Sequence, residues 1–248
     1  MNILVTGSAG MLGATVVDRL AGEHQVTGVD LPDGDLTDLA QVQGIFAKVR
    51  PDWVVHCAAW TDVDGAETPR DQAMAVNAGA TANLVAACDE GGSGLTYLST
   101  DYVFDGEGDG HREDDTRRPV NHYGATKAGG EEAVEAMAGP WQIVRTSWLF
   151  GDGPRNFVRT MRRLLDERET LRVVDDQKGC PTYAPDLADI LAFLVTSGAR
   201  GIFHGTNAGV CTWYDLARET ARRSGQDPDR IRPCPSSEYP TPVVRPRC

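Results

Sequence analysis

The residues best suited to chemistry in this chain are Tyr123 and Lys127, with Thr100 and Asp101 earlier in the sequence. A Tyr and a Lys four positions apart lie on one face of a helix. An ammonium beside a phenol favours the phenolate, and so lowers the pKa of the phenol from its reference of about 10. Such a tyrosine can donate a proton near neutral pH when a ketone is reduced, while the Thr100 hydroxyl holds the carbonyl oxygen. The pattern indicates hydride transfer, although a Tyr-x-x-x-Lys string alone also fits a lysine on a solvated helix face.

A turn of three glycines near the N-terminus has the features of a nucleotide site. Glycine permits positive φ, and its missing Cβ lets the backbone approach a pyrophosphate. The helix that follows offers free N–H groups and the positive end of its dipole to the phosphates. The spacing is Gly-x-x-Gly-x-x-Gly, which differs from the Gly-x-Gly-x-x-Gly of many dinucleotide folds. The residues predicted to bind the cofactor here are Gly7, Gly10, Met11, Leu12 and Gly13.

A carboxylate at the end of the second expected strand bears on the choice of cofactor. Asp30 can bond a ribose 2′-hydroxyl and would repel a 2′-phosphate. No Arg or Lys lies between Asp30 and Lys48 to receive that phosphate. Charge therefore favours NADH over NADPH, unless Asp30 is only a turn residue. The further predicted cofactor contacts are Asp35, Leu36, Ala58, Ala59 and Trp60.

Alternating strands and helices are expected to position these residues. Apolar strands are predicted at 2–6, 25–30, 53–57, 95–99 and 142–147, and helices at 37–49, 71–90 and 123–137, with Thr37 as an N-cap. Strands that alternate with helices form βαβ units and a parallel sheet covered on both faces. The predicted fold class is therefore α/β, with a Rossmann-type doubly wound parallel sheet over residues 1–150.

The second part of the chain is predicted to be a smaller substrate-binding lobe. After a loop at 151–154, residues 151–248 contain an Arg-rich helix, a strand at 171–174 and helices at 185–196 and 213–224. A strand is also expected at 201–204. This part carries no second glycine turn, so we assign it mainly to the substrate, with parts of 183–205 returning to the main sheet.

Composition narrows the class of protein. The 248 residues are 41% hydrophobic and 24% charged, which is ordinary for a globular protein. The net charge of −12 argues against nucleic-acid or anionic-membrane partners, and no apolar run approaches the roughly 20 residues that span a bilayer. The six cysteines form no Cys-x-x-Cys pair, and the five histidines show no zinc spacing. We expect a cytoplasmic protein with reduced thiols and a first strand, not a signal peptide, at its start.

The chain resembles the dTDP-4-dehydrorhamnose reductase family of extended short-chain dehydrogenases/reductases. The most specific stretches are Ser-Thr-Asp-Tyr-Val-Phe-Asp-Gly at 99–106 and Arg-Thr-Ser-Trp at 145–148. Together the matching stretches span nearly the whole chain. They are 7–13, 58–64, 66–67, 99–106, 123–127, 145–148, 156–157, 176–182, 213–215, 239–242 and 245–246.

The resemblance implies a role for each matching residue. It implies that Tyr123 protonates the C4 oxygen of a dTDP-linked 4-keto-6-deoxysugar while NADPH or NADH delivers hydride to C4. Lys127 would hold the nicotinamide ribose, and Thr100 would hydrogen-bond the ketone. Asp101 and Trp148 would contact the sugar nucleotide. Asn77 falls where related enzymes have a structural or relay asparagine, so both roles stay open for it, alongside that of a residue at a helix kink.

The family also raises expectations about partners. Some members join subunits through a divalent ion held by glutamates, one of them just after the third glycine. Here Ala14 and Thr15 follow that glycine, so we predict no metal, and a monomer or homodimer. Family members usually continue for some tens of residues beyond the Arg-Pro pair at 245–246, which bears on how firmly the lobe holds its nucleotide.

Two other functions fit the same pattern less well. One branch of the family resembles the non-catalytic, nucleotide-binding regulatory subunit of methionine adenosyltransferase, which would not need Thr100 and Asp101. A sugar-nucleotide epimerase or dehydratase of the same fold would also use a Tyr and a Lys. A dehydratase usually has acidic residues after the active-site threonine, whereas here Tyr102 follows Asp101.

Overall fold

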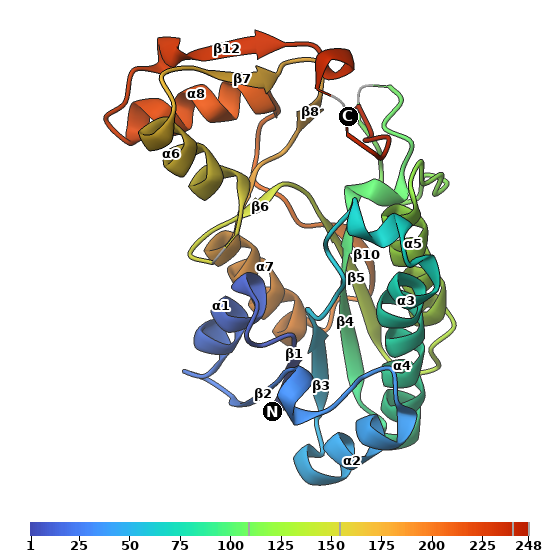
Figure 1. Ribbon diagram of the computed structural model, residues 1–248. Helices are drawn as coiled ribbons and strands as arrows, with labels where there is room; N and C mark the ends of the chain where they lie inside the picture. The colour runs from blue at the N-terminus through green and yellow to red at the C-terminus, as the bar shows by residue number, and fades with distance from the viewer. Residues whose placement is uncertain (109, 154, 240, 248) are drawn as a thin grey trace.

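The computed structural model describes residues 1–108, 110–153, 155–239 and 241–247 (Figure 1). Pro154 of the expected loop, Pro240 of the C-terminal motif and Cys248 lie outside the described residues. In the described chain, six parallel strands form one sheet in the order β10-β5-β4-β3-β1-β2. These strands are β1 (Asn2–Thr6), β2 (Gln25–Val29), β3 (Trp53–His56), β4 (Gly94–Thr100), β5 (Trp141–Thr146) and β10 (Gly201–His204). The sheet is the Rossmann-type parallel sheet that the alternation of elements predicted.

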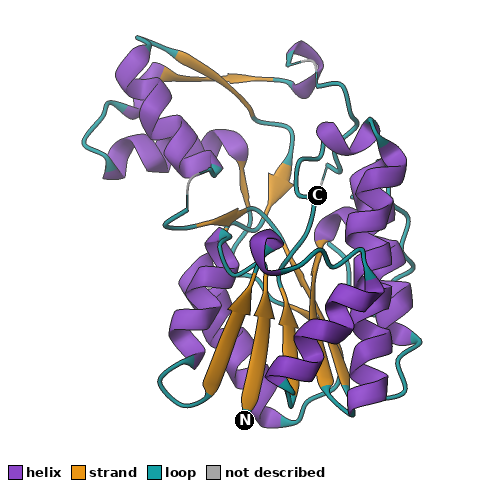
Figure 2. Ribbon diagram, turned by 60° about the horizontal axis from the view of Figure 1, so that its bottom comes forward, coloured by secondary structure: helices purple, strands orange, loops and turns teal. Residues whose placement is uncertain are grey.

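Burial follows the position of each strand in the sheet. Every residue of β3 and of β4 is buried, as expected for central strands covered on both faces. The edge strand β2 is more polar and only Val29 is buried in it. Because all six strands are parallel, their carboxyl ends meet at one edge of the sheet, which faces the smaller lobe (Figure 2).

Two layers of helices cover the sheet (Figure 1). On one face α1 (Met11–Leu20) packs against α7 (Ala184–Ser197), and their apolar side chains join Ile3, Val5 and Val55 in a core cluster. On the other face lie α2 (Leu39–Val49), α4 (Ala80–Gly91) and α5 (His122–Glu135). Cys57 and Cys88 pack against these two clusters, one on each face, as expected for small apolar side chains.

The smaller lobe has a core of its own. In it, α6 (Phe157–Glu167) and α8 (Trp213–Arg223) pack on a parallel pair formed by β7 (Leu171–Val174) and β12 (Ile231–Cys234). Short ladders connect the lobe to the sheet. One pairs β6 (Leu149–Phe150) with β9 (Thr182–Tyr183), and the other pairs β8 (Lys178–Gly179) with β11 (Cys211–Thr212).

The C-terminal residues return from the lobe to the top of α5 (Figure 1). The Lys178 amide donates to the carbonyl of Arg247 at 2.9 Å, and Asn121 Nδ2 donates to the carbonyl of Val244 at 3.0 Å. Arg245 binds Asp64 at 2.7 Å. The segment 241–247 therefore ties the lobe to the sheet domain beside the carboxyl ends of the strands.

The helix expected at 71–90 is present, and a π-helical turn, Ala75–Gly79, which was not expected, lies within it between α3 (Arg70–Met74) and α4. One local prediction was wrong. Thr37 is not the N-cap of α2. Asp38 caps that helix by accepting from the Ala40 amide at 2.9 Å, while the Thr37 hydroxyl donates to Asp35 at 2.7 Å.

Among the described helices, none is both long and apolar enough to span a bilayer.

Candidate active site

Tyr123 and Lys127 are brought to the end of β4 by the first turns of α5. Asn121 caps this helix by accepting from the Gly124 amide at 2.8 Å. A Cβ on Gly124 would lie 2.1 Å from the carbonyl oxygen of Tyr102, so glycine lets the helix press against the 3₁₀ turn Asp101–Val103 that follows β4. Lys127 is only 3% exposed, and its Nζ lies 4.1 Å from the centre of the Tyr97 ring.

The predicted substrate-facing residues form one contact group. Thr100 Oγ1 donates to Asp101 Oδ1 at 2.9 Å and accepts from the Tyr102 amide at 3.2 Å. The Thr100 side chain also lies beside the phenol of Tyr123, where it lowers the pKa of that phenol. The Tyr102 ring packs edge-on against the Tyr123 ring, with centroids 5.7 Å apart. Thr100, Asp101 and Tyr123 therefore lie together at the carboxyl end of β4.

The protonation of this group differs from the expectation that Lys127 lowers the pKa of Tyr123. Burial, with a smaller contribution from the Asp101 carboxylate, raises the pKa of Tyr123 above its ordinary value, and the Thr100 side chain opposes that rise. Burial lowers the pKa of Lys127 to about 7, so this amine titrates near neutral pH. The phenol is neutral and carries the proton that a general acid must donate.

Asp101 is a half-buried carboxyl group at the same place. Burial raises its pKa to about 6, while the hydrogen bond from Thr100 acts in the opposite direction. Near neutral pH it is therefore mostly a carboxylate, which can accept hydrogen bonds from sugar hydroxyls.

The glycine turn forms a cradle that side chains would fill. Gly7 has φ +70°, and a Cβ there would lie 2.6 Å from the amide nitrogen of Ala58. A Cβ on Gly13 would lie 2.0 Å from the carbonyl oxygen of Gly7. Gly10 is the N-cap of α1 and supplies no side chain to cap the first turn. The turn fits a dinucleotide diphosphate, which would receive the N–H groups at the start of α1.

Met11 and Leu12 differ in which of their atoms a bound cofactor could contact. Leu12 is 8% exposed and belongs to the core, so its backbone is the part available to a ligand. Met11 faces the lobe junction, where a Cβ on Gly153 would lie 2.6 Å from the Met11 Cβ. Its sulfur also accepts from Asn156 Nδ2 at 3.7 Å.

The residues predicted to contact the adenosine end of the cofactor also make hydrogen bonds or core contacts within the protein. Asp30 Oδ2 accepts from the Ala9 amide and Oδ1 from the Leu31 amide, both at 2.9 Å, so the carboxylate is fixed beside the glycine turn. Asp35 Oδ1 accepts from the Thr37 amide at 2.9 Å. Leu36 packs against the core clusters under α2 and α4. Asp30 is therefore both a turn residue and a fixed negative charge.

Asn77 connects the loop after β3 to α5. In the π-helical turn, its Oδ1 accepts from the Trp60 amide at 2.7 Å, and its Nδ2 donates to the Trp60 carbonyl at 3.1 Å. The same Nδ2 donates to Thr126 Oγ1 at 2.8 Å. Asn77 thus fixes the loop that contains Ala58 and Ala59 against the helix that carries Lys127. These side-chain contacts give it a structural role.

Trp148 lies at the junction of β5 with the lobe. It has φ +45°, and its ring stacks on Trp213 of α8 with centroids 3.4 Å apart and planes at 8°. A Cβ on Gly179 would lie 2.3 Å from Trp148 Cε2, so only glycine fits beneath the ring. The structure therefore places this predicted substrate contact in an aromatic stack with the lobe.

A buried polar network under the site was missed from the sequence. Glu131 of α5 accepts from Ser99 at 2.5 Å and from Arg145 at 2.9 and 2.7 Å, and Arg117 adds a further bond at 3.1 Å. A signal was present, because Glu131 continues the four-residue spacing of Tyr123 and Lys127.

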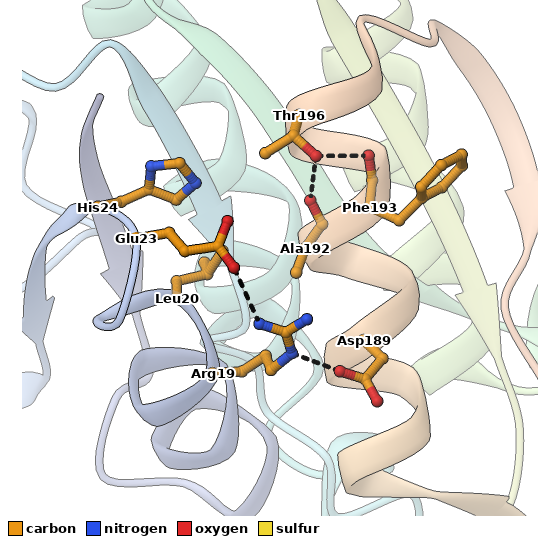
Figure 3. A pocket seen from close by; sticks show the side chains of 8 residues that line it. All are labelled: Arg19, Leu20, Glu23, His24, Asp189, Ala192, Phe193 and Thr196. Atoms are coloured by element: carbon orange, nitrogen blue, oxygen red, sulfur yellow. Dashed lines mark hydrogen bonds and ion pairs between the residues drawn. The ribbon is translucent and has the colours of Figure 1, made fainter.

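A small surface pocket lies elsewhere. About 220 Å³ in volume, it opens between α1 and α7 (Figure 3). Arg19 crosses it and pairs with Asp189 on one side and with Glu23, at 3.9 Å, on the other. Its lining contains none of the predicted site residues, so we locate the candidate site from the converging side chains at the strand ends and not from this pocket.

Comparison with known proteins gives consistent matches along the chain. Residues 1–248 match the family described as RmlD substrate binding domain. The chain is 46% identical over 247 residues to a dTDP-4-keto-6-deoxy-D-glucose reductase of Streptomyces niveus, covering 98% of this chain and 86% of that one. It is 46% identical over 254 residues to a dTDP-4-dehydrorhamnose reductase of Streptomyces griseus, covering 98% and 83%.

Solved structures agree with the sequence matches. A dTDP-4-dehydrorhamnose reductase from Bacillus anthracis in complex with NADP superposes with a TM-score of 0.96 at 37% identity, covering 99% of this chain and 88% of that one. A UDP-glucose 4-epimerase from Thermus thermophilus in complex with NAD gives 0.84 at 25% identity, covering 99% and 91%.

Proposed function

Because the chain belongs to the RmlD substrate binding domain family, we propose that it reduces the C4 ketone of a dTDP-linked 4-dehydro-6-deoxysugar with a nicotinamide cofactor. Its substrate is dTDP-4-dehydro-L-rhamnose, which gives dTDP-L-rhamnose, or a close relative. The observation that carries the proposal is the contact group of Thr100 and Tyr123 at the end of β4, with the buried Lys127 one helical turn further on.

The chain's own residues account for the proton chemistry. A bound nicotinamide cofactor supplies the hydride. The Tyr123 phenol, protonated at neutral pH, donates its proton to the C4 oxygen, and general acids of this kind contribute roughly 10²–10⁴-fold in rate. The Thr100 hydroxyl holds the same oxygen, while the charged fraction of Lys127 stabilises the phenolate that is left. Lys127 would also hold the nicotinamide ribose, and the glycine turn the diphosphate.

The direct test is oxidation of NAD(P)H by the purified chain with dTDP-4-dehydro-L-rhamnose and a panel of related 4-ketosugar nucleotides. We expect loss of the reduced cofactor and formation of the 6-deoxysugar nucleotide. The absence of turnover with every 4-ketosugar in the panel would overturn the proposal. We expect the enzyme to act in the cytoplasm. We also expect it to be a monomer or homodimer, and light scattering measures the molar mass that distinguishes the two.

We further propose that NADH is preferred to NADPH. The support is the fixed carboxylate of Asp30, held by the Ala9 and Leu31 amides beside the glycine turn, where it can bond a 2′-hydroxyl and repel a 2′-phosphate. Steady-state kcat/KM with each cofactor measures the preference. We expect a higher value with NADH and a smaller difference in Asp30→Asn. A wild-type preference for NADPH would contradict the assignment.

Likeness to the UDP-glucose 4-epimerase of Thermus thermophilus favours a second candidate, a sugar-nucleotide epimerase. An epimerase returns the hydride to the same sugar and so regenerates its cofactor. Net consumption of NAD(P)H in proportion to product therefore separates the two functions. Epimerisation without net cofactor consumption would favour the second.

A further inference from the structure

Glu131 has no part in the chemistry described above, yet it is fully buried beneath the site. It lies on α5 at the third step of a four-residue spacing that begins with Tyr123 and Lys127. Residues at this spacing share one face of a helix. The Glu131 carboxylate is therefore one turn from Lys127, on the face that packs against the sheet.

Each oxygen of this carboxylate receives two hydrogen bonds. Oε1 accepts from Ser99 Oγ at 2.5 Å and from Arg145 Nε at 2.9 Å. Oε2 accepts from Arg145 Nη2 at 2.7 Å and from Arg117 Nη1 at 3.1 Å. Bonds between guanidinium groups and a carboxylate are charge-assisted and are stronger than neutral hydrogen bonds. They hold the Glu131 side chain in one place.

The donors come from three segments that surround the site. Ser99 immediately precedes Thr100 at the end of β4, and Arg145 belongs to β5. Arg117 lies in the loop that leads into α5, and it also binds Glu135 at 2.8 Å. The carboxylate of Glu131 consequently joins α5 to the strand that carries Thr100.

We propose that Glu131 is a positioning residue for the reductase site, which places a carboxylate one helical turn from Lys127 and holds the end of β4 against the helix that carries Tyr123. The inference rests on the proposed function, because it assigns a role in that same site.

Four further titratable groups of the described chain lie near Lys127, and none of the four carries a negative charge near pH 7. The Tyr97 ring lies under its Nζ, and burial raises the pKa of Tyr97 and of Tyr123. On β3, burial lowers the pKa of His56 to about 3, and burial raises the pKa of the neighbouring Cys57 to about 12. All four groups are neutral near pH 7.

Glu131 is accordingly the charged group that supports the ammonium. Burial lowers the pKa of Lys127, and the Glu131 carboxylate acts in the opposite direction. Arg145 and Arg117 share that carboxylate and so reduce its effect on Lys127. Removing the charge should lower the pKa of Lys127 further.

The test is the pH profile of kcat/KM for Glu131→Gln. Since Lys127 acts while protonated, its loss of charge forms the alkaline limb of the profile. We expect that limb to move to lower pH by roughly one unit, which is a tenfold loss on the alkaline side that recovers on the acid side. A purely structural role would lower activity equally at every pH, and an unshifted limb would overturn the proposal.

Three further variants make the test specific. Glu131→Asp keeps the charge and should restore most of the limb. Glu135→Gln is the matched control, because Glu135 also binds Arg117 but lies one turn further from Lys127, and its limb should not move. If Glu131→Gln does not fold, Arg117→Gln removes a cation from the same carboxylate at a partly exposed position. The alkaline limb of the kcat/KM profile of Arg117→Gln should move to higher pH, and an unmoved limb would overturn the proposal.

Cofactor binding can be measured without the sugar substrate, so it tests the role of Glu131 separately from the proposed function. Failure of the wild type to reduce any 4-ketosugar would reject the function alone. NAD(P)H binding, followed by fluorescence across the pH range, would then test Glu131. In Glu131→Gln, binding should weaken at lower pH than in the wild type, because Lys127 would hold the ribose less well once neutral. Superimposable binding profiles would reject the role of Glu131.

Discussion

The two ends of the proposed cofactor site are built in opposite ways. At the diphosphate end, the glycine turn works by lacking side chains, since a Cβ at Gly7 or Gly13 would strike neighbouring backbone. At the hydride end, the site is filled with buried polar side chains, each tied to another element, as Lys127 and Glu131 illustrate. The first end depends on empty space, and the second on a network of fixed partners. Substitutions at the two ends should therefore fail for different reasons.

The largest effect is expected at the hydride end. Tyr123→Phe removes the proton donor but keeps the ring that packs against Tyr102. We expect kcat to fall by roughly 10²–10⁴-fold while the dissociation constant for NAD(P)H changes little. Steady-state kinetics and fluorescence titration measure the two quantities. Tyr183→Phe, at a partly exposed ring, is the control and should retain wild-type kcat. A Tyr123→Phe enzyme with near-normal kcat would show that another group supplies the proton.

At the diphosphate end, Gly13→Ala should act on binding. The new Cβ would lie 2.0 Å from the Gly7 carbonyl oxygen, and backbone cannot yield as a flexible side chain can. Overpacking of this kind costs about 1–3 kcal/mol of stability, and the displaced turn should raise the cofactor dissociation constant. Gly22→Ala, where no atom lies within 4 Å, should bind normally. Equal cofactor affinity in both variants would show that the glycine turn is not part of the cofactor site.

Asn77 tests the network that supports the hydride end. Asn77→Ala leaves the Trp60 amide and carbonyl without their side-chain partner, and should lower the free energy of unfolding by about 1–3 kcal/mol. Urea denaturation measures this change. Asn83→Ala is a milder control, because that side chain donates to the Leu36 carbonyl at 3.0 Å near the edge of the core. A larger loss at Asn83 than at Asn77 would contradict the structural role of Asn77.

These two ends also differ in how far sequence predicts them. The glycine turn and the Tyr123–Lys127 spacing are local patterns, so their elements and most boundaries could be predicted. The partners of Glu131 come from β4, β5 and a loop, and no local spacing brings them together. The π-helical turn at Asn77 is likewise invisible, because an alanine-rich stretch predicts an ordinary helix. The direction of the Tyr123 pKa depends on burial, which the spacing of two residues does not reveal.

The smallest effect concerns a glycine outside both ends. Gly44 lies exposed in the middle of α2, where a Cβ would meet no atom within 4 Å. Gly44→Ala should therefore raise the free energy of unfolding by about 0.5–1 kcal/mol without changing kcat. Gly28→Ala should lower it instead, because its Cβ would lie 2.7 Å from the Ser8 Cβ. Thermal denaturation of both variants measures the two changes in the free energy of unfolding. Changes of the same sign in both variants would contradict this comparison of a permissive glycine with a required one.

The most direct measurement of the central claim follows the hydride itself. The wild-type chain would be supplied with dTDP-4-dehydro-L-rhamnose and reduced cofactor that carries deuterium at the transferred position, and the product sugar would be analysed by NMR. The account predicts deuterium bonded to C4, with the proton on the C4 oxygen drawn from the protein and exchangeable with water. A sugar product without deuterium at C4, or no reduction of the ketone at all, would contradict it.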